Sequence, residues 1–369
     1  MGRLNDLESH GQAVWLDFVD RKFLNEGGLT KLVEEDGITG VPSNPSIFEK
    51  AMGHGTAYDE SLAAFDRAHP EASAMARYEH LAVEDIQNAA DTLRPIYDRL
   101  NAKDGYVSLE VSPKLAEDTD GTIAEAARLW KAVDRPNLMI KIPGTPEGVP
   151  AIAASIAAGI NINVTLLFSI EAYKAVALAY VEGLEQRVAK DQPIDRLASV
   201  ASFFVSRIDS KIDDRIDAGT GGEEAKALKG KVAIANAKMA YAWYQEFIAS
   251  DRWRKLAEKG AMPQRLLWAS TGTKNPAYPD TLYIDTLIGP DTVNTVPPKT
   301  LDAFRDHGNV AETLTQDVDG ARKVLADAER LGLDLDGVTA LLVQEGVHSF
   351  IHSFDDLLGA IAAKHPAAA

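Results

Sequence analysis

Eight short apolar runs, separated by longer segments of helical periodicity, constrain this chain more than any other feature of its sequence. The runs are AVWLDFV (13–19), ITGVP (38–42), YVSLEVS (106–112), NLMIKIP (137–143), INVTLLF (162–168), LASVASFFVSRI (197–208), RLLWAST (265–271) and TVNTVPP (292–298). Helical patterns cover 72–100, 123–132, 170–190, 223–257 and 320–331. Strands that alternate with helices indicate βαβ units and a parallel sheet. We therefore predict an α/β fold, a (β/α)8 TIM barrel with additional helices. A doubly wound sheet is the alternative, but no G-x-G-x-x-G opens the first unit.

The chain is expected to form one domain, because no linker rich in Pro, Ser or Gly divides it. A length of 369 residues is typical of an α/β barrel that carries insertions. We predict a single barrel domain over 1–369, with helical insertions around 48–100 and 209–260. A C-terminal helix is expected around 337–363.

Composition and charge exclude several classes of function. The formal net charge is −17, and no basic stripe that could neutralise nucleic-acid phosphates is visible. The absence of cysteine excludes disulfides, thiolate metal sites and cysteine nucleophiles. No apolar stretch is long enough to span a bilayer, and the first residues do not resemble a secretory signal. We therefore expect a cytoplasmic protein with neither nucleic acid nor membrane as a partner, and any bound phosphate would need local cations.

Polar residues interrupt almost every apolar run at or near its C-terminal end. A strand buried on both faces normally reads as continuous hydrophobic residues, and barrel enzymes place catalytic groups at the C-terminal ends of their strands. The interruptions therefore predict one site at that end of the barrel. They are Asp17, Asn44, Glu110, Lys141, Asn163, Thr165, Ser202, Arg207, Ser270 and Lys274.

Lys141 is the most unusual of these residues, because it lies between Ile140 and Ile142 in an apolar strand. A desolvated amine is more readily neutral, and a neutral amine attacks a carbonyl to give a Schiff base. The alternative is a structural lysine in a salt bridge. Asp17 and Glu110 can supply general acid and base functions, or form ion pairs with Lys141 and Arg207.

The remaining polar residues suit a phosphorylated sugar. Hydroxyl and amide side chains match a polyhydroxylated substrate, and they are Asn44, Asn163, Thr165, Ser202 and Ser270. Arg207 and Lys274 match its phosphate.

The motifs around these residues resemble those of the transaldolase family, in particular its longer bacterial type. GVPSNPSIFEKA (40–51) resembles the N-terminal signature of the family, and NLMIKIPGTPEGVPAI (137–152) resembles its Schiff-base lysine signature. SLEVSPKLAEDTDGTI (108–123), INVTLLFS (162–169) and SFFVSRI (202–208) also match, in the same order along the chain.

The resemblance implies a role for each residue. Lys141 would form the Schiff base, Glu110 and Thr165 would hold a catalytic water, and Asp17 would be the acid and base at the bond that is cleaved. The implied binding residues are Asn44 and Asn163 for hydroxyls, Ser202 and Phe204 in the pocket wall, and Arg207 for phosphate. The family has a second phosphate-binding Arg just after the serine that Ser270 matches; here no Arg is present, and Lys274 is our substitute.

The implied reaction transfers a dihydroxyacetone unit from sedoheptulose 7-phosphate or fructose 6-phosphate to glyceraldehyde 3-phosphate or erythrose 4-phosphate, in the non-oxidative pentose phosphate pathway. It needs no metal or organic cofactor, because the protonated imine accepts the electrons. The sequence leaves a monomer and a homodimer open.

Two other functions remain as alternatives. Fructose-6-phosphate aldolases, which cleave without transfer, are shorter and tend to have Gln where Glu110 lies and Tyr where Phe204 lies. A barrel that only binds sugar phosphates would not need Asp17, Glu110, Lys141 and Thr165 together.

Overall fold

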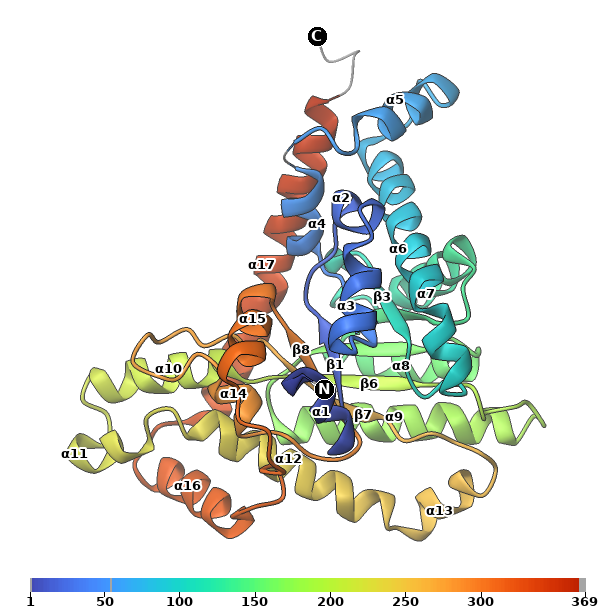
Figure 1. Ribbon diagram of the computed structural model, residues 1–369. Helices are drawn as coiled ribbons and strands as arrows, with labels where there is room; N and C mark the ends of the chain where they lie inside the picture. The colour runs from blue at the N-terminus through green and yellow to red at the C-terminus, as the bar shows by residue number, and fades with distance from the viewer. Residues whose placement is uncertain (1, 54, 365–369) are drawn as a thin grey trace.

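Eight parallel strands form a closed barrel in the order in which they occur along the chain, which confirms the predicted (β/α)8 fold with additional helices (Figure 1). The computed structural model describes residues 2–53 and 55–364. The strands are β1 (Gln12–Leu16), β2 (Gly40–Val41), β3 (Tyr106–Glu110), β4 (Leu138–Pro143), β5 (Ile162–Leu167), β6 (Ser199–Phe204), β7 (Arg265–Ala269) and β8 (Thr292–Val296). Each lies within one of the apolar runs of the sequence, except that β1 begins one residue before its run, at Gln12.

The shortest strand, β2, fits against β1 because it carries a glycine. Trp15 of β1 is opposite Gly40 of β2 and is fully buried. A Cβ atom at position 40 would lie 2.4 Å from the Trp15 ring. Only a residue without a side chain allows this close approach. Gly40 therefore lets the largest side chain of β1 pack across the neighbouring strand.

Helices follow the strands and cover the barrel. Between the first four strands lie α2 (Arg21–Asn25), α3 (Gly28–Asp36), α4 (Pro45–Met52), α5 (Asp59–Ala68), α6 (Ala74–Arg99) and α7 (Thr119–Val133). Between β4 and β8 lie α8 (Gly148–Ala157), α9 (Ile170–Val188), α10 (Ser206–Asp217), α11 (Gly222–Ala225), α12 (Val232–Ile248), α13 (Asp251–Ala257) and α14 (Leu282–Asp285). The chain begins with α1 (Arg3–Ser9) and continues after β8 with α15 (Pro298–His307), α16 (Val318–Arg330) and α17 (Leu335–Ala363).

Two local predictions differ from the structure. The apolar run 197–208 is not one strand, because β6 ends at Phe204 and α10 begins at Ser206, so Arg207 lies in the first turn of a helix. The helical pattern 223–257 is also broken. Gly230 has a φ of +68°, and the Ser250 side chain caps the N-terminus of α13.

The long helix α17 packs beside α4 and reaches the C-terminal end of the barrel (Figure 1). The hydroxyls of Ser46 and Ser353 lie 2.8 Å apart and join the two helices. Gly346 of α17 packs against Leu166, where a Cβ at 346 would lie 2.7 Å from a leucine methyl. Part of α17 therefore contacts strand β5 directly. Within residues 2–53 and 55–364, no helix is both long and apolar enough to cross a membrane.

Candidate active site

A cavity of about 460 Å³ lies at the C-terminal ends of the strands, where the sequence predicts the site. The structure brings together most of the predicted residues in its wall: Asp17, Asn44, Lys141, Thr165, Ser202, Phe204, Arg207, Ser270 and Lys274. Glu110 and Asn163 do not line this cavity, although both are paired with Lys141 in the sheet.

Lys141 projects from β4 and is only 5% exposed. Its Nζ donates a hydrogen bond of 3.1 Å to the Ser43 carbonyl and lies 3.7 Å from Glu110 Oε2. Phe350 of α17 covers it, with the ring centroid 6.0 Å from Nζ. Ile140 and Ile142 are buried but do not line the cavity, because side chains alternate between the two faces of a strand. The side chain that lies over the amine at the cavity is therefore that of Phe350, a tertiary neighbour, and not that of either sequence neighbour.

Glu110 lies at the end of β3, in register with Lys141. Burial raises the pKa of Glu110 to about 7, and the nearby Lys141 charge opposes this only in part. Neither carboxylate oxygen has a hydrogen-bond partner among the described residues. The carboxyl can therefore exchange a proton near neutral pH.

Thr165 also has a buried hydroxyl without a hydrogen-bond partner among the described residues. It lies within an irregularity of β5, where the register with β6 shifts between Val164 and Leu167. Leu166 has a φ of +59°, which is unfavourable for a leucine and is held by the packing of α17. Thr165 and Glu110 thus place three buried oxygens, without a hydrogen-bond partner in the described part of the chain, on β5 and β3, the two strands that flank β4 and its Lys141.

Asn163 joins a buried chain of hydrogen bonds inside the barrel. Its Nδ2 donates to Ser108 Oγ at 3.0 Å, and its Oδ1 accepts from Ser202 Oγ at 2.7 Å. Asn163 is fully buried, whereas Ser202 lies at the cavity wall. The position of Asn163 therefore orients Ser202 directly.

Asn44 lies between the strand end and α4, as the sequence SNP favours. Its Oδ1 accepts a hydrogen bond of 2.9 Å from the Ile47 backbone N–H, which caps α4, and Pro45 occupies the first helical position. With Oδ1 engaged in the cap, the Nδ2 group remains to donate.

Asp17 follows β1 directly, and its backbone N–H donates to the Val296 carbonyl at 3.0 Å. Burial raises the pKa of Asp17. Four cations oppose this effect, in decreasing order Lys141, Lys274, Lys50 and Arg207. Among the described residues, no such cation lies within 4.0 Å of the Asp17 carboxylate. The ion-pair alternative therefore applies to Glu110 with Lys141, and not to Asp17.

The cationic part of the cavity includes a residue that the sequence analysis did not select. Arg207 lies with its guanidinium carbon 5.5 Å from the Phe204 ring, and burial lowers its pKa. Burial also lowers the pKa of Lys274, with further contributions from Arg207 and Lys50. Lys50, on α4, lines the same cavity and is exposed. It is part of the quoted motif 40–51, but it is far from any strand end in sequence.

Ser270 directly follows β7 and has a left-handed conformation, with a φ of +56°. Its hydroxyl lies 3.1 Å from that of Ser206, and its carbonyl accepts from the Ser206 N–H at 3.3 Å. These contacts stabilise a strained backbone at the cavity wall, where strain is often associated with function.

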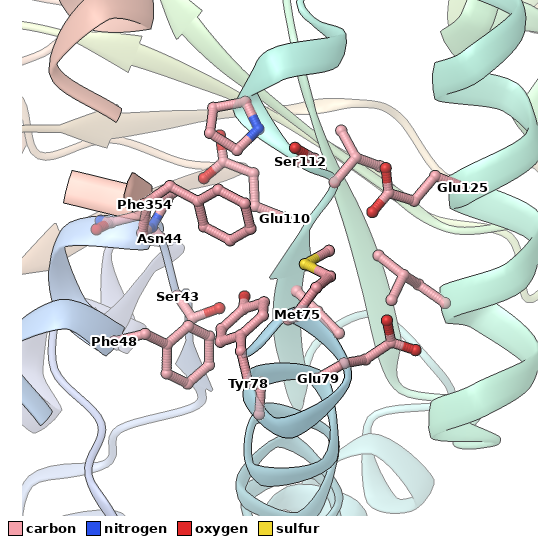
Figure 2. Close-up of a pocket in the computed structure, with 16 residues that line it drawn as sticks. Ser43, Asn44, Phe48, Met75, Tyr78, Glu79, Glu110, Ser112, Glu125 and Phe354 are labelled. Atoms are coloured by element: carbon pink, nitrogen blue, oxygen red, sulfur yellow. The ribbon is translucent and has the colours of Figure 1, made fainter. Parts of the chain in front are cut away.

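A second, much smaller cavity of about 10 Å³ lies beside Glu110 and outside the main one. Figure 2 shows its wall, in which Tyr78 of α6 points toward Glu110 while Glu79 and Glu125 lie on the other side. Sequence reasoning gave no indication of this cavity, because α6 belongs to a segment that carries no strand-end residue. Within residues 2–53 and 55–364, no group of three or more His, Asp or Glu side chains is arranged to hold a metal ion.

The closed parallel barrel and the lysine-containing cavity at its strand ends define a (β/α)8-barrel enzyme. The family profile described as "Transaldolase/Fructose-6-phosphate aldolase" matches residues 14–361. The transaldolase of Trichodesmium erythraeum (strain IMS101) is 47% identical over 98% of this chain and 97% of its own length. The transaldolase of Thiobacillus denitrificans (strain ATCC 25259 / T1) is 49% identical over 98% of this chain and 100% of its own length, and that of Thermobifida fusca (strain YX) is 49% identical over 97% of both chains. The chain belongs to the transaldolase family and is a transferase.

Proposed function

We propose that this transaldolase moves a dihydroxyacetone unit from sedoheptulose 7-phosphate or fructose 6-phosphate to glyceraldehyde 3-phosphate or erythrose 4-phosphate, through a Schiff base on Lys141. The observation that carries the proposal is the 3.7 Å approach of the buried Lys141 amine to Glu110, whose pKa is about 7, in the wall of a cationic cavity. A general acid or base is most effective when its pKa lies near the working pH.

The first half of the reaction joins the donor to Lys141. Ionised Glu110 first takes a proton from the Lys141 ammonium, 3.7 Å away, and the neutral amine then attacks the C2 carbonyl of the ketose and forms a carbinolamine. Glu110 and Thr165, acting through a water, protonate the C2 hydroxyl, which leaves as water while the nitrogen lone pair forms the iminium. The free Thr165 hydroxyl and the unsatisfied Glu110 oxygens support this assignment.

The second half breaks and remakes a carbon–carbon bond. Asp17 removes the proton of the C4 hydroxyl, the C3–C4 electron pair moves into the iminium, and the aldose leaves while an enamine remains. The enamine then attacks the carbonyl of the acceptor aldose, Asp17 returns its proton to the new hydroxyl, and hydrolysis of the iminium releases the product. The raised pKa of Asp17 suits a group that takes up and returns one proton.

The cations of the cavity are proposed to bind the phosphate of both sugars. Arg207 is the main ligand, because its guanidinium can pair with two phosphate oxygens. Lys274 takes the place of the second Arg of the family, and Lys50 adds a third positive charge from α4. In a chain with a net charge of −17, this local excess of positive charge favours an anionic ligand.

The hydroxyls of the sugar are proposed to contact the neutral polar side chains. Asn44 donates from its free Nδ2, Ser202 is held in place by Asn163, and Ser270 lies near the phosphate end, with Phe204 as the apolar wall. Asn163 is fully buried and does not line the cavity, so it is proposed to act on the substrate through Ser202, whose hydroxyl it holds.

We further propose that the enzyme works in the cytoplasm, in the non-oxidative pentose phosphate pathway, without a metal or organic cofactor. The chemistry requires none, because the iminium is the electron acceptor. Its partners are sugar phosphates rather than nucleic acid or membrane, and both a monomer and a homodimer are compatible with the proposal.

Borohydride trapping tests the Schiff base. The protein is incubated with fructose 6-phosphate and borohydride, and the adduct is located by mass spectrometry. A three-carbon adduct on Lys141 is expected, and Lys141→Ala should abolish both the adduct and the activity. Lys114→Ala is the control, because this exposed lysine pairs with Asp355 outside the cavity. Activity that survives in Lys141→Ala would refute the mechanism and favour a barrel that only binds sugar phosphates.

Product analysis separates transfer from simple cleavage. Transfer predicts little free dihydroxyacetone from fructose 6-phosphate alone, and sedoheptulose 7-phosphate once erythrose 4-phosphate is added. Rapid release of dihydroxyacetone without an acceptor would favour the aldolase alternative.

A further inference from the structure

Glu110 lines the small cavity and faces Lys141, which lines the main cavity. The residue is 6% exposed, and both of its carboxylate oxygens lack a hydrogen-bond partner among the described residues. The small cavity has a volume of about 10 Å³, which corresponds to the space for one water molecule. Its wall offers this water polar neighbours in Glu110, Tyr78 and Ser112 (Figure 2). A buried carboxylate with unsatisfied oxygens gives a water at this position a strong acceptor.

The wall of the same cavity also includes two carboxylates that are partly exposed to solvent. The side chains of Glu79 and Glu125 are 23% and 12% exposed, and both pair with Arg128. Burial raises the pKa of Tyr78, and Glu110, Glu125 and Glu79 raise it further, which places the phenol among the three carboxylates. Tyr78 is thus a neutral hydroxyl that can both donate and accept a proton.

The charged and titratable groups around Glu110 come from three elements. Lys141 of β4 faces it from the main site. Tyr78 and Glu79 of α6 and Glu125 of α7 face it across the small cavity. Phe354 of α17 closes the wall without a charge (Figure 2).

The proposed reaction gives this arrangement a task. Formation of the iminium releases one water, formed from the C2 hydroxyl and one proton, and hydrolysis of the iminium takes one water up again. At both steps the sugar phosphate fills the mouth of the main cavity, which contains Phe350 and the phosphate-binding cations. A second route would therefore let water and protons reach Glu110 while the substrate is bound.

We propose that the small cavity is a water-binding site that connects Glu110 to the surface through Tyr78, so that Glu110 exchanges protons without passing the substrate. This inference rests on the proposed function. Tyr78 is a positioning residue in it, because its hydroxyl holds the water that donates to Glu110 and does not touch the substrate.

Tyr78→Phe removes this hydroxyl and leaves the ring in place. The free enzyme starts the cycle with ionised Glu110, and loss of a hydrogen bond that favours the ionised form raises the pKa of this group. The acidic limb of the pH profile of kcat/KM should therefore move to higher pH by about half a unit to one unit. At pH 6 this lowers kcat/KM by roughly three- to tenfold, whereas the rates at pH 8.5 and the KM for fructose 6-phosphate stay within about twofold.

Tyr244→Phe is the matched control. Tyr244 is 2% exposed and its hydroxyl has no partner among the described residues, but it lies on α12, away from both cavities. This variant should keep the wild-type pH profile. A second variant, Ala82→Val, fills the small cavity without removing a hydroxyl and should shift the limb in the same direction as Tyr78→Phe.

Each result decides the proposal. The proposal would be overturned if the pH profile of Tyr78→Phe superimposed on that of the wild type. It would also be overturned if Tyr244→Phe shifted the acidic limb as much as Tyr78→Phe does. Melting temperatures identify a variant that is only misfolded. Borohydride trapping on Lys141 separates this failure from that of the proposed function. Trapping with an unchanged Tyr78→Phe profile refutes the water route alone, whereas absence of trapping in the wild type refutes the Schiff-base mechanism.

Discussion

The substitution Glu110→Gln should make the protein more stable at alkaline pH while it impairs catalysis. Burial raises the pKa of Glu110 from 4.5 to about 7, so the folded protein binds this proton more tightly than the unfolded chain does. The contribution of this bound proton to the free energy of unfolding is fully present below about pH 4.5, and it is lost as the pH rises through 7. Gln is neutral throughout and does not lose it.

The magnitude follows from the pKa difference. The full difference corresponds to roughly 3 kcal/mol, and between pH 5 and pH 8.5 the wild type should lose roughly 2 to 3 kcal/mol relative to Glu110→Gln. The Lys141 charge, 3.7 Å away, is already included in this balance, because it lowers the pKa of Glu110 only in part.

Urea unfolding at pH 5 and pH 8.5 measures the effect. The stability difference between Glu110→Gln and wild type is determined at each pH, and its change between the two is compared with the expected value. The control is Glu117→Gln, at an exposed position a few residues after Glu110 in the sequence. Its stability difference from the wild type should be the same at both pH values. A difference for Glu110→Gln that is independent of pH, or that favours the wild type at pH 8.5, would refute the assignment of a raised pKa to this carboxyl.

Three further predictions concern the phosphate site, the cover over the amine and the barrel wall. Lys274→Met should raise the KM for fructose 6-phosphate by roughly tenfold. Lys50→Met should raise the KM by less, and mainly at low salt, because salt screens an exposed charge. Steady-state kinetics at two ionic strengths measure both effects, and unchanged KM values would contradict the prediction. Phe350→Ala should slow the formation of the borohydride-trapped adduct by roughly tenfold with a smaller change in KM, because water then reaches the amine; equal trapping rates would speak against the role of this ring. Gly40→Ala should lower the free energy of unfolding by about 2 to 3 kcal/mol, because its Cβ would lie 2.4 Å from the Trp15 ring. Gly359 lies at an exposed position in α17 with open space around it, so Gly359→Ala should instead raise the free energy of unfolding by about 0.5 to 1 kcal/mol. Thermal melts of the two variants distinguish these opposite effects.

Much of the site could be predicted from the sequence because strand ends are visible in it. A parallel strand reads as an apolar run, so a polar residue such as Lys141 or Asp17 at its end stands out, and all strand ends of a barrel meet at one rim. Lys50 could not be found in this way, because it reaches the cavity from the exposed end of a helix. Phe350 lies far along the chain in α17 and resembles any other core residue in sequence.

The roles of residues within one predicted group also needed the structure. Asn163 and Ser202 look alike as strand residues, yet one is enclosed in a hydrogen-bond chain and the other reaches the cavity. Apart from the family resemblance, the sequence did not distinguish the chemical environments of Glu110 and Asp17. In the structure, Glu110 faces Lys141 and a second cavity, whereas Asp17 lies among cations without a close ion pair.

The sequence by itself determined the barrel and the position of Lys141 at a strand end, because periodicity and local composition depend on short stretches of chain. Tertiary structure alone decided which groups cover the Lys141 amine, which carboxyl has a pKa of about 7, and where a second cavity opens beside Glu110. The physical reason is that desolvation and electrostatic interaction depend on distances through space. The helix α17, near the end of the chain, meets α4 and α6, which lie between β2 and β3, only when the barrel closes.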